Sequence, residues 1–155
     1  MFRINLTSVY MIIYLFVIPS YAAATTEYNV WYQKEGVMYD VTQTLENEPV
    51  LISITANSSP DAVMVITLKN DGACDATSVQ EPLKIDFRKV SVSRSCLVSR
   101  DIYFVTYVIK DLAVIDYVLK QLRAGFTVVL MDSIKIWAGN INKPLHGYGK
   151  WFQNQ

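Results

Sequence analysis

The chain has 155 residues, with 14 basic and 14 acidic side chains and a hydrophobic fraction of 52%. This composition is too apolar for an intrinsically disordered chain, and the length suits one ordinary domain better than two. The equal numbers of acids and bases argue against a general nucleic-acid-binding protein, which needs an excess of lysine and arginine for phosphate contacts.

The N-terminus has the pattern of a secretory signal peptide. One arginine is followed by an unbroken apolar run over residues 9–18. Small residues at the −3 and −1 positions fit cleavage after Ala22 or after Ala24. The alternative, a membrane anchor, needs about 20 apolar residues, and no later run is long enough either. We expect a signal peptide over residues 1–22 and a single β-rich periplasmic domain over residues 25–155.

Charge is unevenly distributed along the expected mature chain. Residues 27–81 contain nine acids and two lysines, whereas residues 82–155 contain eleven bases and five acids. The simpler interpretation is that the two halves pack together and their charges compensate. The alternative is a polarised surface that steers a charged partner.

The first half of the mature chain predicts two pairs of strands. Residues 28–33 and 37–42 flank a glycine-containing turn and form an expected opening hairpin. Residues 50–55 and 62–68 are β-branched and apolar, and turn-forming residues separate them. This second pair is predicted to be a hairpin with a longer loop.

The most basic part of the chain follows. Residues 83–88 alternate apolar and charged side chains, which predicts a strand with one buried face. Arg88, Lys89 and Arg94 belong to a basic stretch over residues 84–100 and are candidate contacts for an anionic partner, such as an acidic protein, lipid headgroups or polysaccharide. The alternative is a solvated outer face of a sheet.

Two cysteines, Cys74 and Cys96, remain in the mature chain. An even number of cysteines in an exported chain favours a disulfide, which would stabilise a loop of this size by about 3 kcal/mol. The alternatives are two free thiols or a pair of metal ligands. A structural zinc site needs four ligands, and the one histidine, His146, is far along the chain. We expect no metal site.

A central strand and then a helix are predicted next. Residues 102–109 are rich in aromatic and β-branched side chains, and we expect them in the middle of the sheet. Apolar side chains then recur at helical spacing, which predicts a helix over about residues 111–124. Asp111 can cap its first turn, and Gly125 is suited to the left-handed residue that ends a helix.

The remaining chain is predicted to add two short strands, over residues 126–131 and 134–138. From Pro144 we expect a loop followed by a short helical turn. These elements indicate a mainly β fold, specifically a single-domain β-sandwich with one α-helix packed at an edge.

The sequence provides no recognisable catalytic pattern. His146 lies between Leu145 and Gly147 and more closely resembles a loop residue than a catalytic histidine. The glycines are scattered rather than clustered as in a phosphate-binding loop. We expect no cofactor and no enzyme activity, although the two carboxylates of a glycosidase need not be close in sequence.

The C-terminal tail carries a compact aromatic cluster. Tyr148, Trp151 and Phe152 lie within five residues. Tyrosine and tryptophan are enriched at protein interfaces because they combine a large apolar body with a polar atom. These three residues are candidate contacts for a partner protein, and the alternative is that they are core or sheet-surface residues.

The C-terminal half resembles the invasion-associated locus B family of bacterial periplasmic proteins. The resemblance rests on the step Leu122-Arg123-Ala124-Gly125, the strand 126–130 and the closing segment Lys143-Pro144-Leu145-His146-Gly147-Tyr148-Gly149-Lys150-Trp151-Phe152. An early Trp31 and two mid-chain cysteines are also similar. The resemblance implies an exported β-rich domain without established enzyme activity. His146 and Gly149 depart from the family pattern.

Together these features predict an exported, non-enzymatic envelope protein that binds a protein partner, such as an accessory, invasion-associated or secretion-associated factor. One alternative is a periplasmic inhibitor or immunity protein that blocks a toxic enzyme. The other is a small envelope glycan hydrolase that uses dispersed carboxylates.

Overall fold

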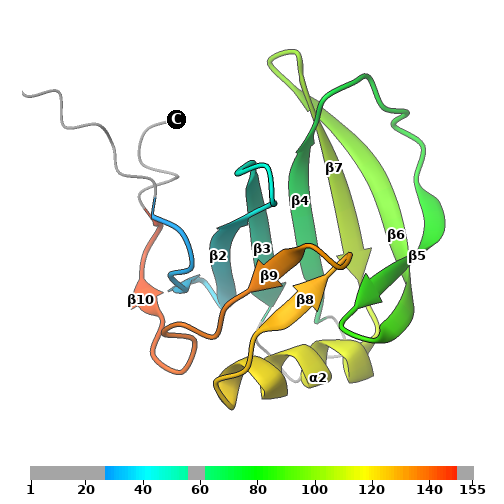
Figure 1. Cartoon of the computed structure of the whole chain (residues 1–155). Coiled ribbons are helices and arrows are strands. Elements are labelled where there is room, and N and C mark those ends of the chain that lie inside the picture. Colours follow the sequence, from blue (N-terminus) through cyan, green and yellow to red (C-terminus); the bar gives the residue numbers. More distant parts are fainter. Residues whose placement is uncertain (1–26, 56–61, 150–155) are drawn as a thin grey trace, which may run out of the picture.

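The structure, a computed structural model, describes residues 27–55 and 62–149 (Figure 1). The expected signal peptide lies outside the described residues. The strands, in chain order, are β1 (Tyr32–Lys34), β2 (Val37–Gln43), β3 (Pro49–Thr55), β4 (Met64–Asn70), β5 (Val79–Ile85), β6 (Arg88–Ser99), β7 (Ile102–Ile109), β8 (Val128–Leu130), β9 (Ile134–Ile136) and β10 (Leu145–His146).

These strands form one mixed sheet with the order β10-β1-β2-β3-β4-β7-β6-β5-β8-β9. The sheet curls into a half-barrel, and the hydroxyl of Thr42 on β2 donates a hydrogen bond of 2.7 Å to the carbonyl of Lys135 on β9. The mainly β prediction is confirmed, but the predicted sandwich is wrong. A sandwich has two sheets, whereas here hydrogen bonds link every strand into one sheet whose far strand curls back towards β2.

The first four strands place the core on the concave face of the sheet. The predicted opening hairpin and the β3–β4 pair are both present and antiparallel. Side chains alternate along β3, so that Val50, Ile52 and Ile54 are fully buried while their neighbours are half-buried. Since cross-strand partners share a face, Met38 opposite Ile54 also points into the core.

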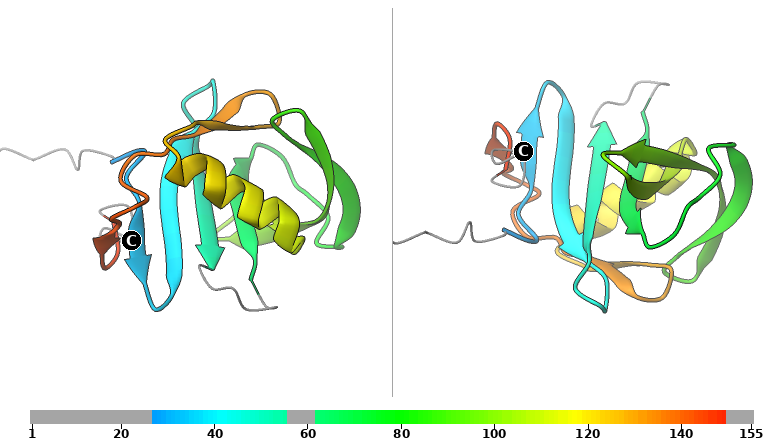
Figure 2. Two further views of the ribbon diagram at one scale, coloured as in Figure 1. Left: turned by 90° about the horizontal axis from the view of Figure 1, so that it is seen from below. Right: turned by 90° about the horizontal axis from the view of Figure 1, so that it is seen from above.

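The helix α2 (Leu112–Arg123) lies across one end of the curled sheet (Figures 1 and 2). Its prediction is confirmed, including the cap, because the Asp111 carboxylate accepts a hydrogen bond of 2.9 Å from the amide of Ala113. Gly125 follows with a φ of +89°, as expected of the residue that ends a helix. The apolar face of the helix enters the core through Val114, Ile115, Val118, Leu119 and Leu122.

Two predicted boundaries are corrected. Residues 83–88 do not form one strand, because the chain turns at Asp86 and Phe87 and returns as β6. Asp86 has a φ of +51°, a left-handed conformation that suits a tight turn. At the C-terminal end, the first residues after Pro144 form β10, parallel to β1, where a loop was predicted. The helical turn that was predicted to follow extends into residues outside the described part of the chain. The predicted position of 102–109 in the middle of the sheet is confirmed by β7.

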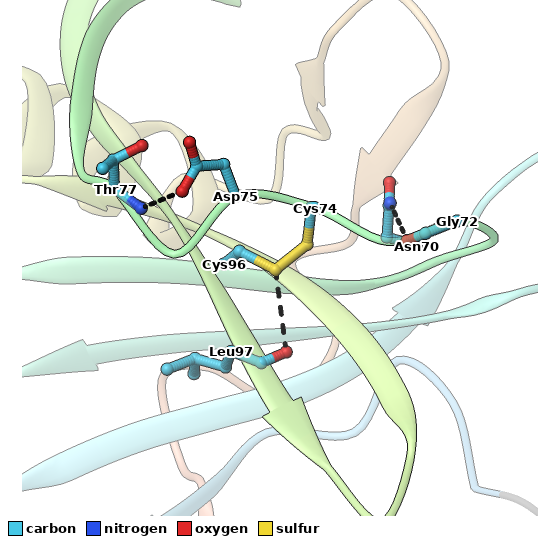
Figure 3. Close-up of a disulfide and its surroundings, with 7 residues drawn as sticks. All are labelled: Asn70, Gly72, Cys74, Asp75, Thr77, Cys96 and Leu97. Atoms are coloured by element: carbon cyan, nitrogen blue, oxygen red, sulfur yellow. Dashed lines mark hydrogen bonds between the residues drawn. A yellow bond between two sulfur atoms is a disulfide. The ribbon is translucent and has the colours of Figure 1, made fainter.

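A disulfide joins Cys74 to Cys96, with a Cα–Cα distance of 5.8 Å (Figure 3). It attaches the long connection between β4 and β5 to the second half of β6. Within this connection, the amide of Thr77 donates a hydrogen bond of 3.0 Å to Asp75 and lowers the pKa of that carboxyl. The predicted disulfide is therefore present and attaches a segment whose residues are mostly exposed.

Candidate functional site

The turn between β5 and β6 exposes a phenylalanine between charged residues. Phe87 is 78% exposed, and Arg88 and Lys89 beside it are also exposed. Successive side chains of a strand point to opposite faces, so Arg88 and Lys89, the first two residues of β6, extend from opposite faces of the strand. We call residues 86–89 the hairpin tip.

Asp86 attaches the hairpin tip to the rest of the fold. Its amide donates a hydrogen bond of 2.7 Å to the carbonyl of Val129, and its carboxylate accepts one of 2.8 Å from the amide of the same residue. The other carboxylate oxygen accepts a hydrogen bond of 2.8 Å from the Tyr117 hydroxyl on α2. This last bond is the main reason that the pKa of Tyr117 is raised. The tip is thus held by both β8 and the helix.

Arg88 lies against aromatic rings. Its guanidinium carbon is 4.1 Å from the centre of the Tyr117 ring and 5.5 Å from that of Phe87. Stacking of this kind restricts the arginine without neutralising its charge. The hairpin tip therefore combines a fixed backbone, an exposed ring and an oriented cation.

Arg94 does not join the hairpin tip. It lies further along β6, is about one-quarter exposed, and its guanidinium is 3.8 Å from the carboxylate of Glu81 on β5. Of the three cations singled out in the sequence, the structure keeps Arg88 and Lys89 together and pairs Arg94 with an acid. Phe87 was not singled out, because the sequence pattern placed it inside a strand rather than at a turn.

A second candidate surface lies on the outer face of the first hairpin. The rings of Tyr32 and Tyr39 stack with their centres 5.9 Å apart, and the centres of Tyr39 and Tyr148 are 6.1 Å apart. The ammonium of Lys34 lies 3.8 Å from the centre of the Tyr148 ring. Interaction with Tyr148 is the main reason that the pKa of Lys34 is raised. The hydroxyl of Tyr32 donates a hydrogen bond of 2.6 Å to Glu27. This bond is the main reason that the pKa of Tyr32 is raised to about 12.

This tyrosine cluster borders an apolar groove with a volume of about 160 Å³. Tyr148 is 51% exposed at its rim. Burial raises the pKa of Tyr39, whose hydroxyl donates to the carbonyl of Gly147. The groove is lined by Val37, Tyr39, Leu51, Ser53 and Tyr148.

The structure describes one of the three residues of the predicted aromatic cluster. Tyr148 lies beside tyrosines of β1 and β2, while Trp151 and Phe152 lie outside the described residues. Sequence patterns carried no signal for the clustering of these tyrosines, because the parallel pairing of β10 with β1 brings segments more than 100 residues apart into contact. Figure 1 shows β10 and the β5–β6 turn on opposite sides of the molecule.

One carboxylate is buried in the core. Asp40 is 1% exposed on β2, opposite Ile52, and neither of its carboxylate oxygens has a hydrogen-bond partner among the described residues. Burial raises its pKa to about 7, although the nearby amides of Val30, Val41 and Asn29 oppose this shift. Because Asp40 is enclosed, it cannot contact a glycan substrate as a general acid.

Other chemistry suggested by residue type is not assembled in the described part of the chain. His146 lies on the short strand β10, and both cysteines are used in the disulfide. Within residues 27–55 and 62–149, histidine, cysteine and carboxylate side chains form no cluster of three that could bind a metal ion. The same residues contain no helix long and apolar enough to cross a membrane.

Comparison of the chain with protein-family models, curated proteins and solved structures found no match. The resemblance to the invasion-associated locus B family therefore rests on sequence motifs alone.

Proposed function

We propose that this chain is an exported, non-enzymatic envelope protein that binds a partner protein through its hairpin tip. The observation that carries the proposal is the exposure of Phe87, next to the exposed cations Arg88 and Lys89, on a turn that Asp86 fixes. A large ring that is 78% exposed leaves apolar area in water, and burying it against a partner would be favourable.

The rigidity of the tip supports a role in binding. Association costs less when side chains and loops are already ordered, and aromatic residues and arginine dominate the energy of many interfaces. In the free protein, Asp86 and the Tyr117 ring already restrict the turn and Arg88. The matching partner surface has an apolar pocket for the phenylalanine and acidic groups around it.

Two features of the sequence support an exported location. The N-terminal signal pattern precedes the fold, and the Cys74–Cys96 disulfide is typical of oxidising compartments such as the periplasm. The resemblance to invasion-associated locus B proteins agrees with this location. An inhibitor or immunity protein is a narrower form of the same proposal, since a rigid projecting turn suits insertion into the cleft of an enzyme.

Site-specific photocrosslinking tests the proposal. A photoreactive phenylalanine analogue would replace Phe87 in the full-length chain, which would be expressed in its own host. The matched control would carry the same analogue at Leu45, which is 72% exposed on another turn. We expect one protein to crosslink at the hairpin tip and not at the control position.

Affinity measurements with the purified partner would then separate contact from function. We expect F87A to weaken binding by about 30-fold, as for a central interface anchor. The charge reversal R88E/K89E should slow association, with an effect that shrinks at high salt. Wild-type affinity in both variants, with unchanged folding, would overturn the proposal. Hydrolysis of peptidoglycan or glycan by the purified protein would instead favour the hydrolase alternative.

A further inference from the structure

We propose that the apolar groove beside Tyr148 is the seat for an aromatic side chain of the chain's own C-terminal segment, residues 150–155. This inference concerns a surface that the proposed partner-binding function does not use. It assigns an intramolecular ligand, Trp151 or Phe152, to a groove that the described residues leave open to solvent.

The chemistry of the groove fits an aromatic ring. Its exposed wall is apolar, and its volume of about 160 Å³ matches the cavities of about 150 Å³ that accommodate a benzene-sized ring. The rim carries Tyr39 and Tyr148, whose rings are already tilted towards each other at 36°. A third ring could pack against them edge to face, an arrangement that aromatic side chains favour.

The described chain ends against the same outer face. The carbonyl of Gly147 accepts the hydroxyl hydrogen bond of Tyr39. Gly149, the last described residue, lies so close to Tyr32 that a Cβ atom there would be 2.9 Å from the ring carbon Cε2. A larger residue at this point would displace the Tyr32 ring, whereas glycine lets the backbone run along the stacked tyrosines.

The remaining segment is long enough to reach the groove. Trp151 and Phe152 are two and three residues beyond Gly149, and an extended chain advances about 3.5 Å per residue. Tyr148 is itself part of the groove wall, so the segment starts at the rim. A tethered ring also has a high effective concentration, on the order of millimolar for a short linker, which favours it over a free partner.

Seating of this ring would stabilise the start of the sheet. β10 contains two residues and pairs with β1, which contains three. A ring held between Tyr148, which follows β10, and the side chains of β2 and β3 would add apolar contacts beside this short pairing. The C-terminal aromatic residues would then act as a structural closure rather than as a partner-binding patch.

Methyl NMR of the full-length mature chain tests the inference directly. We expect nuclear Overhauser effects between ring protons of Trp151 or Phe152 and the methyl groups of Val37 and Leu51. W151A, F152A and a chain ending at Gly149 should identify the ring, with loss of these signals and shifts of the same methyl groups. The matched control is F126A, which removes a ring that is 61% exposed on a different loop.

Peptide addition provides a second test of the inference. Addition of the peptide KWFQNQ to the shortened chain should restore the methyl shifts of Leu51, and L51A should weaken this binding. Contacts seen only between differently labelled copies would overturn the intramolecular assignment and give the groove to a second copy. Methyl groups of Val37 and Leu51 that respond to neither truncation nor peptide would overturn the inference altogether. The partner affinity of F87A does not enter this test, so the two proposals can fail separately.

Discussion

Asn140 holds the backbone of Trp31 from both directions. Its side-chain oxygen accepts a hydrogen bond of 2.8 Å from the Trp31 amide, and its side-chain nitrogen donates one of 3.0 Å to the Trp31 carbonyl. The indole nitrogen donates a third bond of 2.9 Å to the carbonyl of Trp137. Residues 109 positions apart in the sequence are thereby joined, and the C-terminal loop is fixed to the start of the sheet.

The first prediction concerns this junction. N140A removes the acceptor for the Trp31 amide, whereas the Trp31 carbonyl keeps a bond from the amide of Leu145. We expect a loss of about 2 kcal/mol in the free energy of unfolding, because a part-buried donor is left without a partner. Urea unfolding followed by tryptophan fluorescence measures this loss.

Asn142 provides the matched control for this junction. Its side chain donates a single exposed hydrogen bond of 3.0 Å to the carbonyl of Arg123, so N142A should cost about 0.5 kcal/mol. N140D should lie between the two, since it keeps the acceptor and loses the donor. Equal stability of N140A and N142A would refute the role assigned to Asn140.

The second prediction concerns the pH dependence that Asp40 introduces. Burial raises its pKa to about 7 in the folded protein, whereas an unfolded aspartate titrates near 3.9. The folded state therefore binds the proton more tightly between these values. The stability from this group is complete below about pH 4 and is lost as the pH rises through 7, by an amount on the order of 4 kcal/mol.

Unfolding in urea at pH 5 and pH 8 tests this expectation. Wild-type protein should be less stable at pH 8, and D40N should reduce the difference because an amide does not ionise. D71N is the control, since the Asp71 side chain is 93% exposed and should leave the pH dependence unchanged. If wild type and D40N lose equal stability between the two pH values, Asp40 is not the titrating group.

The third prediction concerns the Cys74–Cys96 disulfide. Replacing both cysteines with serine should lower the free energy of unfolding by about 3 kcal/mol, because the disulfide limits the freedom of the unfolded chain. Reductant should destabilise the wild-type protein similarly and leave the double variant unaffected. Two free thiols found by alkylation and mass spectrometry in folded protein would contradict the bond.

Local sequence patterns predicted the separate elements well. The α2 helix follows from the repeat of apolar residues between Asp111 and Gly125, since capping and helix termination depend on near neighbours. The β5–β6 turn was missed because alternation continues through residues 83–88, and Asp86 adopts its positive φ with hydrogen bonds to Val129 and Tyr117. Those two partners are 31 and 43 residues away.

The sequence alone determined that the chain is mainly β, that a helix follows the long strand β7, and that two cysteines are available to pair. It also singled out Arg88, Lys89 and Tyr148. Only the tertiary structure decided that the strands form one curled sheet rather than a sandwich. It also decided that Phe87 is exposed at a turn and that an apolar groove lies beside Tyr148. The physical reason is that alternation along a strand specifies which side chains are buried together, while strand order depends on contacts between segments distant in sequence.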